Sequence, residues 1–498
     1  MKRLYAFALL LFALAAMCSA ENAKSTISSS TLTLSVHDSL LMALETNRSL
    51  AVERYGPEIN RTFIADEGSV FDPVLSSDFS AAESIGQRTS GVGQFTGVSS
   101  RSKTANLGIS KRTPLGLNVD LEASASTRES NVYTRLYSTR LGTTLTMPLL
   151  EGLGSNVNLV GVRLAERDVD ISEYELRGFV LALAAQTEEF YWDLLSAREE
   201  LQIRLRSLDL ARQQFTETQD RIDVGEIAEI ELAAAEGEVA LREEAVIDAH
   251  SALEKTALQL LRTLNPPAEN LWSLTVDLID SPSMEITPLD SVETYVAIAL
   301  AARPDINQAR LQLEKQELNI VRTRNGLLPR LDFFLTLGTT GYARTFSDSL
   351  SKINGDNFDL TTGFVFEYGL GNRAKRARHE RAQFRVEEAQ AALWNFEQLI
   401  ELDVRTAYIE IQRAAKQITA THIATRLQDA KYLAEQEKFR VGKSTNLLVL
   451  VAQRDLTQSQ LDEIRAQINL RKAIMRLHEA KGTLLDHHHI VLPSPAKD

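Results

Sequence analysis

Residues 219–228 read Gln-Asp-Arg-Ile-Asp-Val-Gly-Glu-Ile-Ala, and residues 436–445 read Gln-Glu-Lys-Phe-Arg-Val-Gly-Lys-Ser-Thr. Each stretch places a Val-Gly pair late in a long segment that has no proline, and the two pairs lie 217 residues apart. The same spacing relates Tyr191 to Tyr408. A fixed spacing between landmarks indicates an internal duplication, which must be recognised before a fold is predicted.

Each copy is predicted to contain a long helical hairpin that turns at its Val-Gly pair. Between Asn372 and Lys481 there is one glycine, Gly442, and no proline. Apolar residues recur there every three or four positions, as expected for coiled-coil packing. The sequence predicts helical hairpins at about 155–265 and about 372–482, with outgoing helices of roughly 105 Å and return helices of about 60 Å. Shorter amphipathic helices are expected at Ser39–Ile64 and Ser291–Arg324.

Segments of alternating polarity precede both hairpins, in regions at about 74–149 and about 330–368. Such alternation predicts strands with one apolar and one polar face. We expect one strand hairpin in each copy, hence four strands per chain, with the Gly/Ser/Thr-rich stretch from Ser84 to Thr104 as an exposed loop. Half-buried strands of a soluble sheet would show the same pattern. Two hairpins cannot close a barrel alone, so a transmembrane barrel pooled from several subunits is the preferred interpretation.

The composition and the N-terminal residues limit the classes of protein to which this chain could belong. The chain has 498 residues, 44% of them apolar, and a formal net charge of −13, which disfavours nucleic acid as a partner. Residues 1–20 read as a signal peptide, with Lys2 and Arg3 before an apolar run, and cleavage before Glu21 is preferred. Lipid attachment at Cys18 is the alternative, although Met17 is bulky for that processing. Cleavage would remove the one cysteine, Cys18, so no thiol or disulfide chemistry is expected.

The predicted layout after the signal peptide consists of two repeats, a linker and a tail. The first repeat covers residues 21–265, the linker 266–290, the second repeat 291–483 and the tail 484–498. No phosphate-binding loop and no paired nucleophile and base occur in a recognisable context, so we expect no enzyme activity and no cofactor. His487, His488 and His489 form a histidine run in the tail, for which we expect no metal.

The order of these motifs resembles the TolC-type outer-membrane efflux proteins over nearly the whole mature chain. The most specific matches are the two tips; the others open each repeat, precede the strands and follow them. They are Ala43-Leu44-Glu45-Thr46-Asn47, Ala299-Leu300-Ala301-Ala302-Arg303-Pro304, Phe71-Asp72-Pro73, Leu327-Leu328-Pro329, Met147-Pro148-Leu149-Leu150-Glu151-Gly152 and Tyr368-Gly369-Leu370-Gly371-Asn372-Arg373. The resemblance implies a homotrimer with a twelve-stranded β-barrel in outer-membrane lipid, continued into the periplasm by an α-helical barrel.

The resemblance also implies partners and site residues. A periplasmic adaptor (membrane fusion) protein would dock at the tips and couple the tube to an inner-membrane pump of RND or ABC type, for efflux or type I secretion. The adaptor-docking residues would be Val224, Gly225, Glu226, Val441, Gly442 and Lys443. The alternative is that Gly225 and Gly442 only end their helices, since glycine tolerates the positive φ that a helix end requires.

A charged constriction is expected near the tips of this family, and here the sequence departs from the pattern. The positions six and nine past Gly442 are apolar, Leu448 and Val451, whereas the first tip supplies Glu229 and Glu231. We expect an apolar constriction from one repeat and an acidic, cation-favouring ring from the other. The alternative is that these glutamates form a solvated helix face. For the whole protein, the alternative is a periplasmic coiled-coil scaffold without transport, which would not need amphipathic strands.

Overall fold

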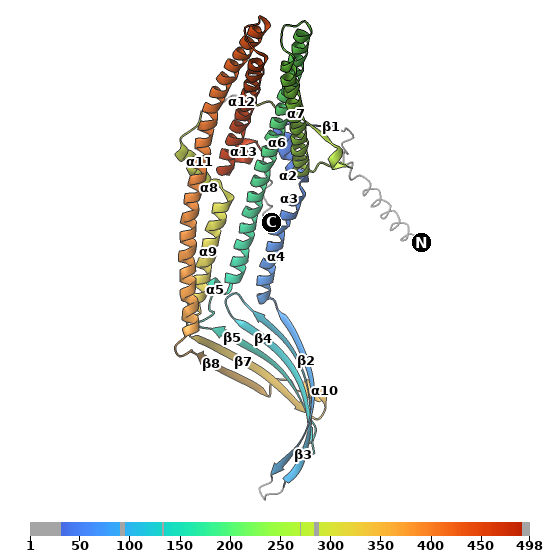
Figure 1. Cartoon of the computed structure of the whole chain (residues 1–498). Coiled ribbons are helices and arrows are strands. Elements are labelled where there is room, and N and C mark those ends of the chain that lie inside the picture. The colour runs from blue at the N-terminus through green and yellow to red at the C-terminus, as the bar shows by residue number, and fades with distance from the viewer. Residues whose placement is uncertain (1–30, 90–94, 132–133, 269, 283–287, 491–498) are drawn as a thin grey trace, which may run out of the picture. The chain divides into compact units, whose positions relative to one another are not determined.

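The computed structural model describes residues 31–89, 95–131, 134–268, 270–282 and 288–490 (Figure 1). The predicted signal peptide with Cys18 and residues 491–498 of the tail lie outside these residues. The chain divides into two compact units. Unit 1 combines Met1–Arg54, Arg177–Pro304 and Glu397–Asp498, and unit 2 combines Tyr55–Leu176 and Asp305–Phe396.

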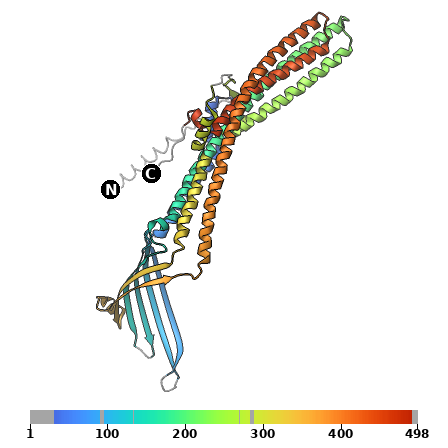
Figure 2. The same cartoon turned by 90° about the vertical axis from the view of Figure 1, so that its left-hand side faces the viewer.

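Four long helices dominate unit 1. The helices α6 (Val160–Asp223) and α11 (Arg373–Arg440) enter it from unit 2, whereas α7 (Ile230–Leu264) and α12 (Asn446–Ala480) lie wholly within it. Their 64, 68, 35 and 35 residues correspond to about 96, 102, 52 and 52 Å at the rise of an α-helix. Figures 1 and 2 both show α7 alongside α6 and α12 alongside α11. Two helical hairpins therefore form, one from each repeat.

Short elements surround the bases of these hairpins in unit 1. They are β1 (Thr31–Leu34), α2 (Val36–Thr46), α3 (Arg48–Glu53), η2 (Leu271–Ser273), β6 (Thr275–Leu278), α8 (Val292–Ala302) and α13 (Leu484–His487). The strands β1 and β6 pair in parallel. Tyr191 of α6 is fully buried, and its hydroxyl donates to Leu34 O (3.2 Å) and contacts Asp280 Oδ2 (2.9 Å). This contact ties the linker after β6 to the first hairpin.

A histidine cluster closes the end of α12. The ring of His478 stacks on that of His487 of α13 at 3.9 Å, and His488 Nε2 lies 2.9 Å from Oε2 of the buried Glu188. Burial, and then the nearby His487, lower the pKa of His478 to about 3. The folded protein therefore holds His478 neutral at physiological pH.

We expect this buried histidine to make the protein sensitive to acid. The pKa of His478 is lower in the folded state than its ordinary value of 6.5. The contribution of neutral His478 to the free energy of unfolding is therefore fully present above pH 6.5 and is lost as the pH falls toward 3. The loss is at most about 1.4 kcal/mol per pH unit. Thermal unfolding of wild type and His478→Gln, followed by circular dichroism from pH 7 to pH 4.5, should show a smaller decrease for the variant. His250→Gln, at an exposed position, is the control; equal decreases for His478→Gln and wild type would contradict the expectation.

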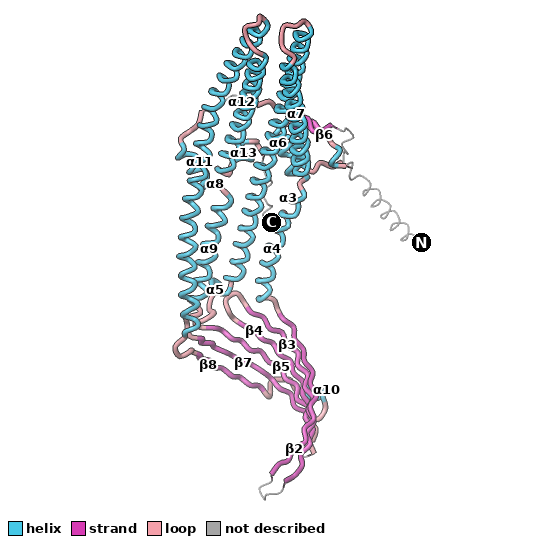
Figure 3. The backbone as a smooth tube through the Cα atoms, in the orientation of Figure 1, coloured by secondary structure: helices cyan, strands magenta, loops and turns pink. Residues whose placement is uncertain are grey.

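Unit 2 contains an antiparallel sheet of six strands (Figure 3). Its strands, in spatial order, are β2 (Val74–Thr89), β3 (Phe95–Arg112), β4 (Asn118–Ser130), β5 (Leu136–Pro148), β7 (Arg330–Ala343) and β8 (Phe358–Glu367). Within the described residues, β2 and β8 each have only one neighbouring strand. The sheet of one chain is therefore open at both edges.

The expectation of one strand hairpin per repeat is wrong for the first repeat, which contributes four strands. The stretch from Ser84 to Thr104, expected to be an exposed loop, instead continues β2 and β3, except for residues 90–94 outside the described chain. This part of the hairpin is mostly polar on both faces, with Ile85 on one face and Val98 on the other. It is held by the main-chain ladder and by cross-strand pairs such as Arg101 Nε to Glu83 Oε1 at 2.9 Å. Without an apolar face, it lacks the alternation that predicts a strand.

The rest of the sheet has one apolar face and one polar face, as the alternation predicted. Register places apolar residues from all six strands on the same face, and many of them are exposed in the single chain. They are Leu75, Leu107, Ile109, Leu121, Leu141, Leu145, Leu335, Leu337, Phe358, Leu360, Phe364 and Phe366. On the opposite face, Arg140 of β5 reaches across β7 to form a bidentate ion pair with Asp359 of β8, with one Nη2–Oδ2 distance of 2.6 Å. Gly338 leaves room for it, since a Cβ there would lie 2.5 Å from Arg140 Nη2.

The other elements of unit 2 are helical. They are α4 (Tyr55–Gly68), η1 (Ser69–Phe71), α5 (Ser155–Asn158), most of α9 (Pro304–Asn325) and α10 (Phe346–Ser351). Pro304, at the first position of α9, explains why α8 and α9 are separate helices. In the described part of the chain, no helix is both long enough and apolar enough to span a bilayer.

Candidate functional site at the helical tips

Both hairpins turn through the same glycine-dependent helix ending. In the first tip, Gly225 has φ +76° and Glu226 N donates to Arg221 O at 2.8 Å. In the second, Gly442 has φ +74° and Lys443 N donates to Lys438 O at 2.7 Å. This is the pattern of a Schellman motif, in which a residue with positive φ ends the helix and satisfies its last carbonyls. The helix-stop role of both glycines is therefore real, whatever else they contact.

Arg221 joins the two tips and was not singled out from the sequence. Its Nη1 donates to Phe439 O at 2.9 Å and its Nη2 contacts Arg440 O at 3.4 Å, at the last residues of α11. The guanidinium carbon lies 4.3 Å from the centre of the Phe439 ring, and Nη2 also bonds Glu217 at 2.9 Å. Its side chain is only 15% exposed. A cation near a helix C-terminus is favoured by the helix dipole, so Arg221 holds the second tip against the first.

The second tip has its own small core. Tyr432 and Phe439 of α11 pack with Val449, Ala452 and Leu456 of α12. Outside this core, the carboxylate of Glu435 accepts hydrogen bonds from Lys438 (2.5 Å) and Ser444 (2.9 Å). These two bonds hold the pKa of Glu435 below its usual value, so the group remains ionised. The turn between α11 and α12 is therefore braced by packing and by an ionic contact.

The predicted docking residues lie at the exposed turns. Val224 is 71% and Val441 is 56% exposed, and Glu226 and Lys443 are exposed as well. Large apolar side chains this accessible at a loop are suited to a protein contact. Their use by a partner stays a prediction.

The predicted constriction residues are also accessible at the tips. Glu229 is exposed and Glu231 is partly exposed at the start of α7, while Leu448 is 51% exposed and Val451 partly exposed on α12. The predicted constriction positions are thus accessible carboxylates at the first tip and accessible apolar side chains at the second. A role in narrowing a pore stays a prediction.

A buried polar stripe links α6 to α12 below the tips. Gln214 Nε2 donates to Asn446 Oδ1 at 2.9 Å, and the hydroxyls of Ser207 and Thr457 lie 3.2 Å apart. All four residues are buried. The seven-residue spacing of Ser207 and Gln214 could have indicated this stripe, because polar residues at a heptad position mark a specific helix register.

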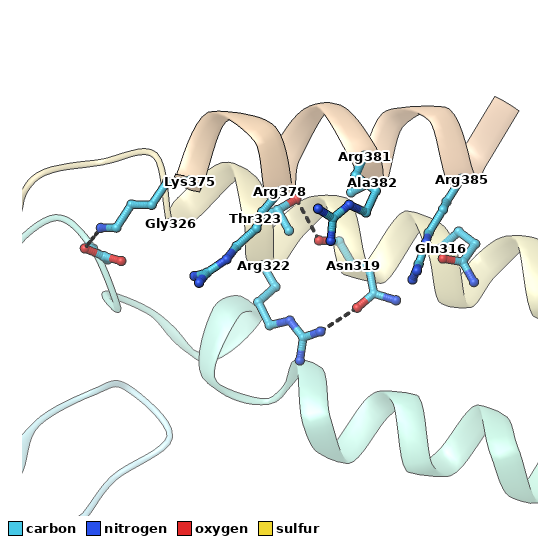
Figure 4. Close-up of a pocket in the computed structure, with 11 residues that line it drawn as sticks. Gln316, Asn319, Arg322, Thr323, Gly326, Lys375, Arg378, Arg381, Ala382 and Arg385 are labelled. Atoms are coloured by element: carbon cyan, nitrogen blue, oxygen red, sulfur yellow. Dashed lines mark hydrogen bonds and ion pairs between the residues drawn. The ribbon is translucent and has the colours of Figure 1, made fainter. Parts of the chain in front are cut away.

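A basic groove lies in unit 2 between α9 and α11, with a volume of about 490 Å³ (Figure 4). Five basic residues and one carboxylate line it: Arg322, Lys375, Arg378, Arg381, Arg385 and Glu151. Lys375 Nζ bonds Glu151 at 2.6 Å. The sequence could have indicated this groove, because α11 begins with the basic run Arg373-Ala374-Lys375-Arg376-Ala377-Arg378. Such a charge excess suits it to contact acidic groups.

Among the described residues, no group of three or more histidine, cysteine, aspartate or glutamate side chains could hold a metal ion. His478 of α12 and His487 of α13 stack on each other, and His488, which follows α13, contacts Glu188.

Comparison with known proteins points to one family. Residues 99–265 and 296–483 match the family model described as outer membrane efflux protein. The chain is 26% identical over 327 residues to the pyoverdine export outer membrane protein OpmQ of Pseudomonas putida, covering 64% of this chain and 65% of OpmQ, just under two thirds. It is 24% identical over 354 residues to the outer membrane efflux protein BepC of Brucella suis, covering 69% of this chain and 72% of BepC.

A solved structure shares the fold. The outer-membrane channel OprN superposes with a TM-score of 0.68 at 18% identity, covering 90% of each chain. At this identity the similarity shows the fold alone.

Proposed function

Because this chain belongs to the outer membrane efflux protein family, it is an outer-membrane protein, and we propose that it is the passive exit channel of a tripartite efflux or type I secretion system. One observation carries the proposal: a sheet with an apolar and a polar face that is open at both edges. Unpaired strand edges are not stable in lipid, so a sheet of this kind needs partners that close it.

A homotrimer would close the sheet into a barrel. Six strands per chain make eighteen in three copies, in place of the twelve inferred from the sequence, when β8 of one copy pairs with β2 of the next. The apolar face would then meet lipid and the polar face, with the pair Arg140–Asp359, would line a water-filled lumen. The long helices of three copies would continue the duct through the periplasm.

The tips are the proposed docking site for a periplasmic adaptor protein. Val224 and Val441 present apolar side chains beside the charged Glu226 and Lys443, which suits a contact with an amphipathic helical hairpin. The adaptor would connect the channel to an inner-membrane pump of RND or ABC type.

The mass and conductance of the purified protein test the channel proposal. After extraction from outer membranes in mild detergent, we expect a protein mass of three chains and discrete conductance steps in planar lipid bilayers. A stable trimer that conducts nothing would favour the periplasmic scaffold instead. A monomer without conductance would overturn both the barrel and the trimer.

Neutralising the acidic tip is expected to reduce cation selectivity. Carboxylates close to a threefold axis would concentrate cations, so the double variant Glu229→Gln, Glu231→Gln should shift the reversal potential in a salt gradient toward zero. The control is Glu243→Gln, an exposed carboxylate farther along α7. An unchanged reversal potential in the double variant would leave these glutamates as a solvated helix face.

The docking residues can be mapped in cells. A photoreactive amino acid at Val224 or Val441 should form covalent adducts with a periplasmic protein, whereas the same group at Trp272, which is 59% exposed in the linker, should not. Mass spectrometry of the adducts would identify the partner. Adducts of equal yield at all three positions would indicate non-specific labelling and count against docking at the tips.

A further inference from the structure

The short helix α10 lies on the apolar face of the sheet, at the end of the sheet remote from α9 (Figures 1 and 3). The hydroxyl of Ser349 lies 2.7 Å from that of Thr139 on β5, and a Cβ at Gly341 of β7 would overlap Ser349 O. Thr139 and Gly341 are paired in the register and alternate in step with Leu141 and Leu337 of the same strands. Positions two apart along a strand share a face, so α10 covers the apolar face.

The side of α10 that faces away from the sheet is apolar. Ser349 is buried against the strands, whereas Phe346 is 51% and Leu350 is 53% exposed. These two residues are four positions apart, so their side chains lie next to each other on the helix. In a helix of only six residues they form a continuous apolar patch rather than two isolated exposed side chains.

The apolar band of the sheet is short where α10 lies. On β7 the apolar side chains of this face run from Leu331 to Leu337, and the next positions on the face are Thr339 and Gly341. This run of β7 measures about 20 Å along the strand, which is about 15 Å across a membrane at the usual tilt of barrel strands. The apolar band of a transmembrane barrel is about 25 Å tall. The strand alone therefore does not fill the height of the band.

The neighbouring strand β8 extends the band to the level of α10. On β8 the apolar side chains of the same face run from Phe366 to Phe358, and Phe358 lies opposite Thr339 in the register. Phe358 is 74% exposed. The patch on α10 thus supplies, over β5 and β7, the kind of apolar surface that Phe358 supplies on β8.

We propose that α10 is an interfacial helix, which buries Phe346 and Leu350 among the acyl chains of the outer leaflet and completes the apolar band of the barrel over β5 and β7. The inference rests on the proposed channel, because it requires that the apolar face of the sheet meet lipid. It goes further by assigning part of the β7–β8 connection to the membrane rather than to the water outside the cell.

The residues at the two ends of α10 suit the level of lipid head groups. Arg344 precedes the helix and Lys352 follows it, and both are exposed. Long basic side chains can extend from an apolar surface to the charged head groups. The one carboxylate of α10, Asp348, lies in the first turn, where the helix dipole favours it, and its main-chain N–H donates to the hydroxyl of Thr345. The helix therefore has an apolar outer side and polar ends.

Quenching of tryptophan fluorescence by brominated lipid tests this placement. The native residues Trp192, Trp272 and Trp394 lie in α6, η2 and α11, away from the sheet, so wild type in vesicles of dibrominated phosphatidylcholine should be quenched little. For the full-length Phe346→Trp trimer in these vesicles, we expect loss of most of the fluorescence that the new tryptophan adds in vesicles without bromine. Leu350→Trp is a second position on the same patch and should lose its added fluorescence as well.

Tyr342→Trp is the matched control. Tyr342 lies on β7 at the same end of the sheet and is 50% exposed, but it is next to Gly341 in the strand and so points to the opposite, polar face. Its added fluorescence should persist in brominated vesicles. Quenching of Tyr342→Trp as strong as that of Phe346→Trp would mean that the bromines do not distinguish the two faces, and it would overturn the assignment of α10 to lipid.

The depth of the bromines tests the interfacial position. An interfacial helix lies at the boundary between head groups and acyl chains, so bromines near the carboxyl end of the chains should quench Phe346→Trp more than bromines near the methyl end. The reverse order would place α10 at the centre of the bilayer and contradict the inference.

Phe364→Trp separates this inference from the channel proposal. Phe364 is 67% exposed on the apolar face of β8, within the part of the band that the strands themselves supply. Quenching of Phe364→Trp without quenching of Phe346→Trp or Leu350→Trp would overturn the role of α10 and leave the barrel intact. Quenching at none of the three positions would remove both the role of α10 and the lipid-facing sheet.

Discussion

Replacement of Arg221 by alanine is expected to raise the single-channel conductance several-fold. Arg221 donates to Phe439 O at 2.9 Å, contacts Arg440 O at 3.4 Å and lies over the Phe439 ring, and so links the two tips of a chain. A charge-assisted hydrogen bond of this kind contributes about 1.5–3 kcal/mol. Because 1.4 kcal/mol is about a tenfold change in an equilibrium, its loss should shift the tips strongly toward separation.

The measurement is the conductance of the purified variant in planar bilayers. Arg212→Ala is the matched control, since Arg212 lies on the same helix but pairs with Glu243 inside the first hairpin, at 2.6 Å. It should conduct like wild type. If Arg221→Ala forms an intact trimer with wild-type conductance, Arg221 does not hold the tips closed.

Replacement of Gly341 by alanine is expected to destabilise the sheet by about 3 kcal/mol, because the new methyl group cannot be accommodated. A Cβ at Gly341 of β7 would lie 1.9 Å from Ser349 O in α10. Avoiding this clash requires α10 to move, which would break the bond between the Ser349 and Thr139 hydroxyls, 2.7 Å apart and buried. Thermal unfolding in detergent and proteolysis of the β7–β8 connection would measure the change.

Gly97→Ala is the matched control for this prediction. Gly97 is also a strand glycine, on β3, and no atom lies within 4 Å of the position its Cβ would take. We expect an unfolding temperature close to that of wild type. An equally small effect of Gly341→Ala would mean that α10 is not held against β5 and β7.

The family was predictable from the sequence, because it follows from the order and spacing of motifs. The resemblance to TolC-type outer-membrane efflux proteins is confirmed by the family match over residues 99–265 and 296–483. The Val-Gly tips and the long segments without proline or glycine can be predicted from neighbouring residues alone. Helix propensity and the tolerance of glycine for positive φ depend only on the residues nearby in the sequence. The predicted domain boundaries, the docking role of the tips and the constriction stay predictions.

The strand count was missed because the outer part of the β2–β3 hairpin is mostly polar and gives no alternation to detect, although Leu75, Leu107 and Ile109 alternate with polar residues nearer its base. Its pairing depends on a main-chain ladder between residues such as Ser84 and Ser100, which the structure brings together. Arg221 was missed for a related reason: its partners, Phe439 and Arg440, lie 218 and 219 residues away in the sequence.

The sequence by itself determined the duplication, the helical hairpins and their turning points, since each depends on neighbours along the chain. The tertiary structure decided which surfaces of the two repeats meet, because the register of α6 on α12 arises from contacts between residues more than two hundred positions apart, such as Lys472 with Asp193. It also decided which faces remain open. At equivalent positions of the two repeats, Trp192 is 5% exposed and Ile409 is 61% exposed, so the fold and not the repeat decides which of the two positions is covered.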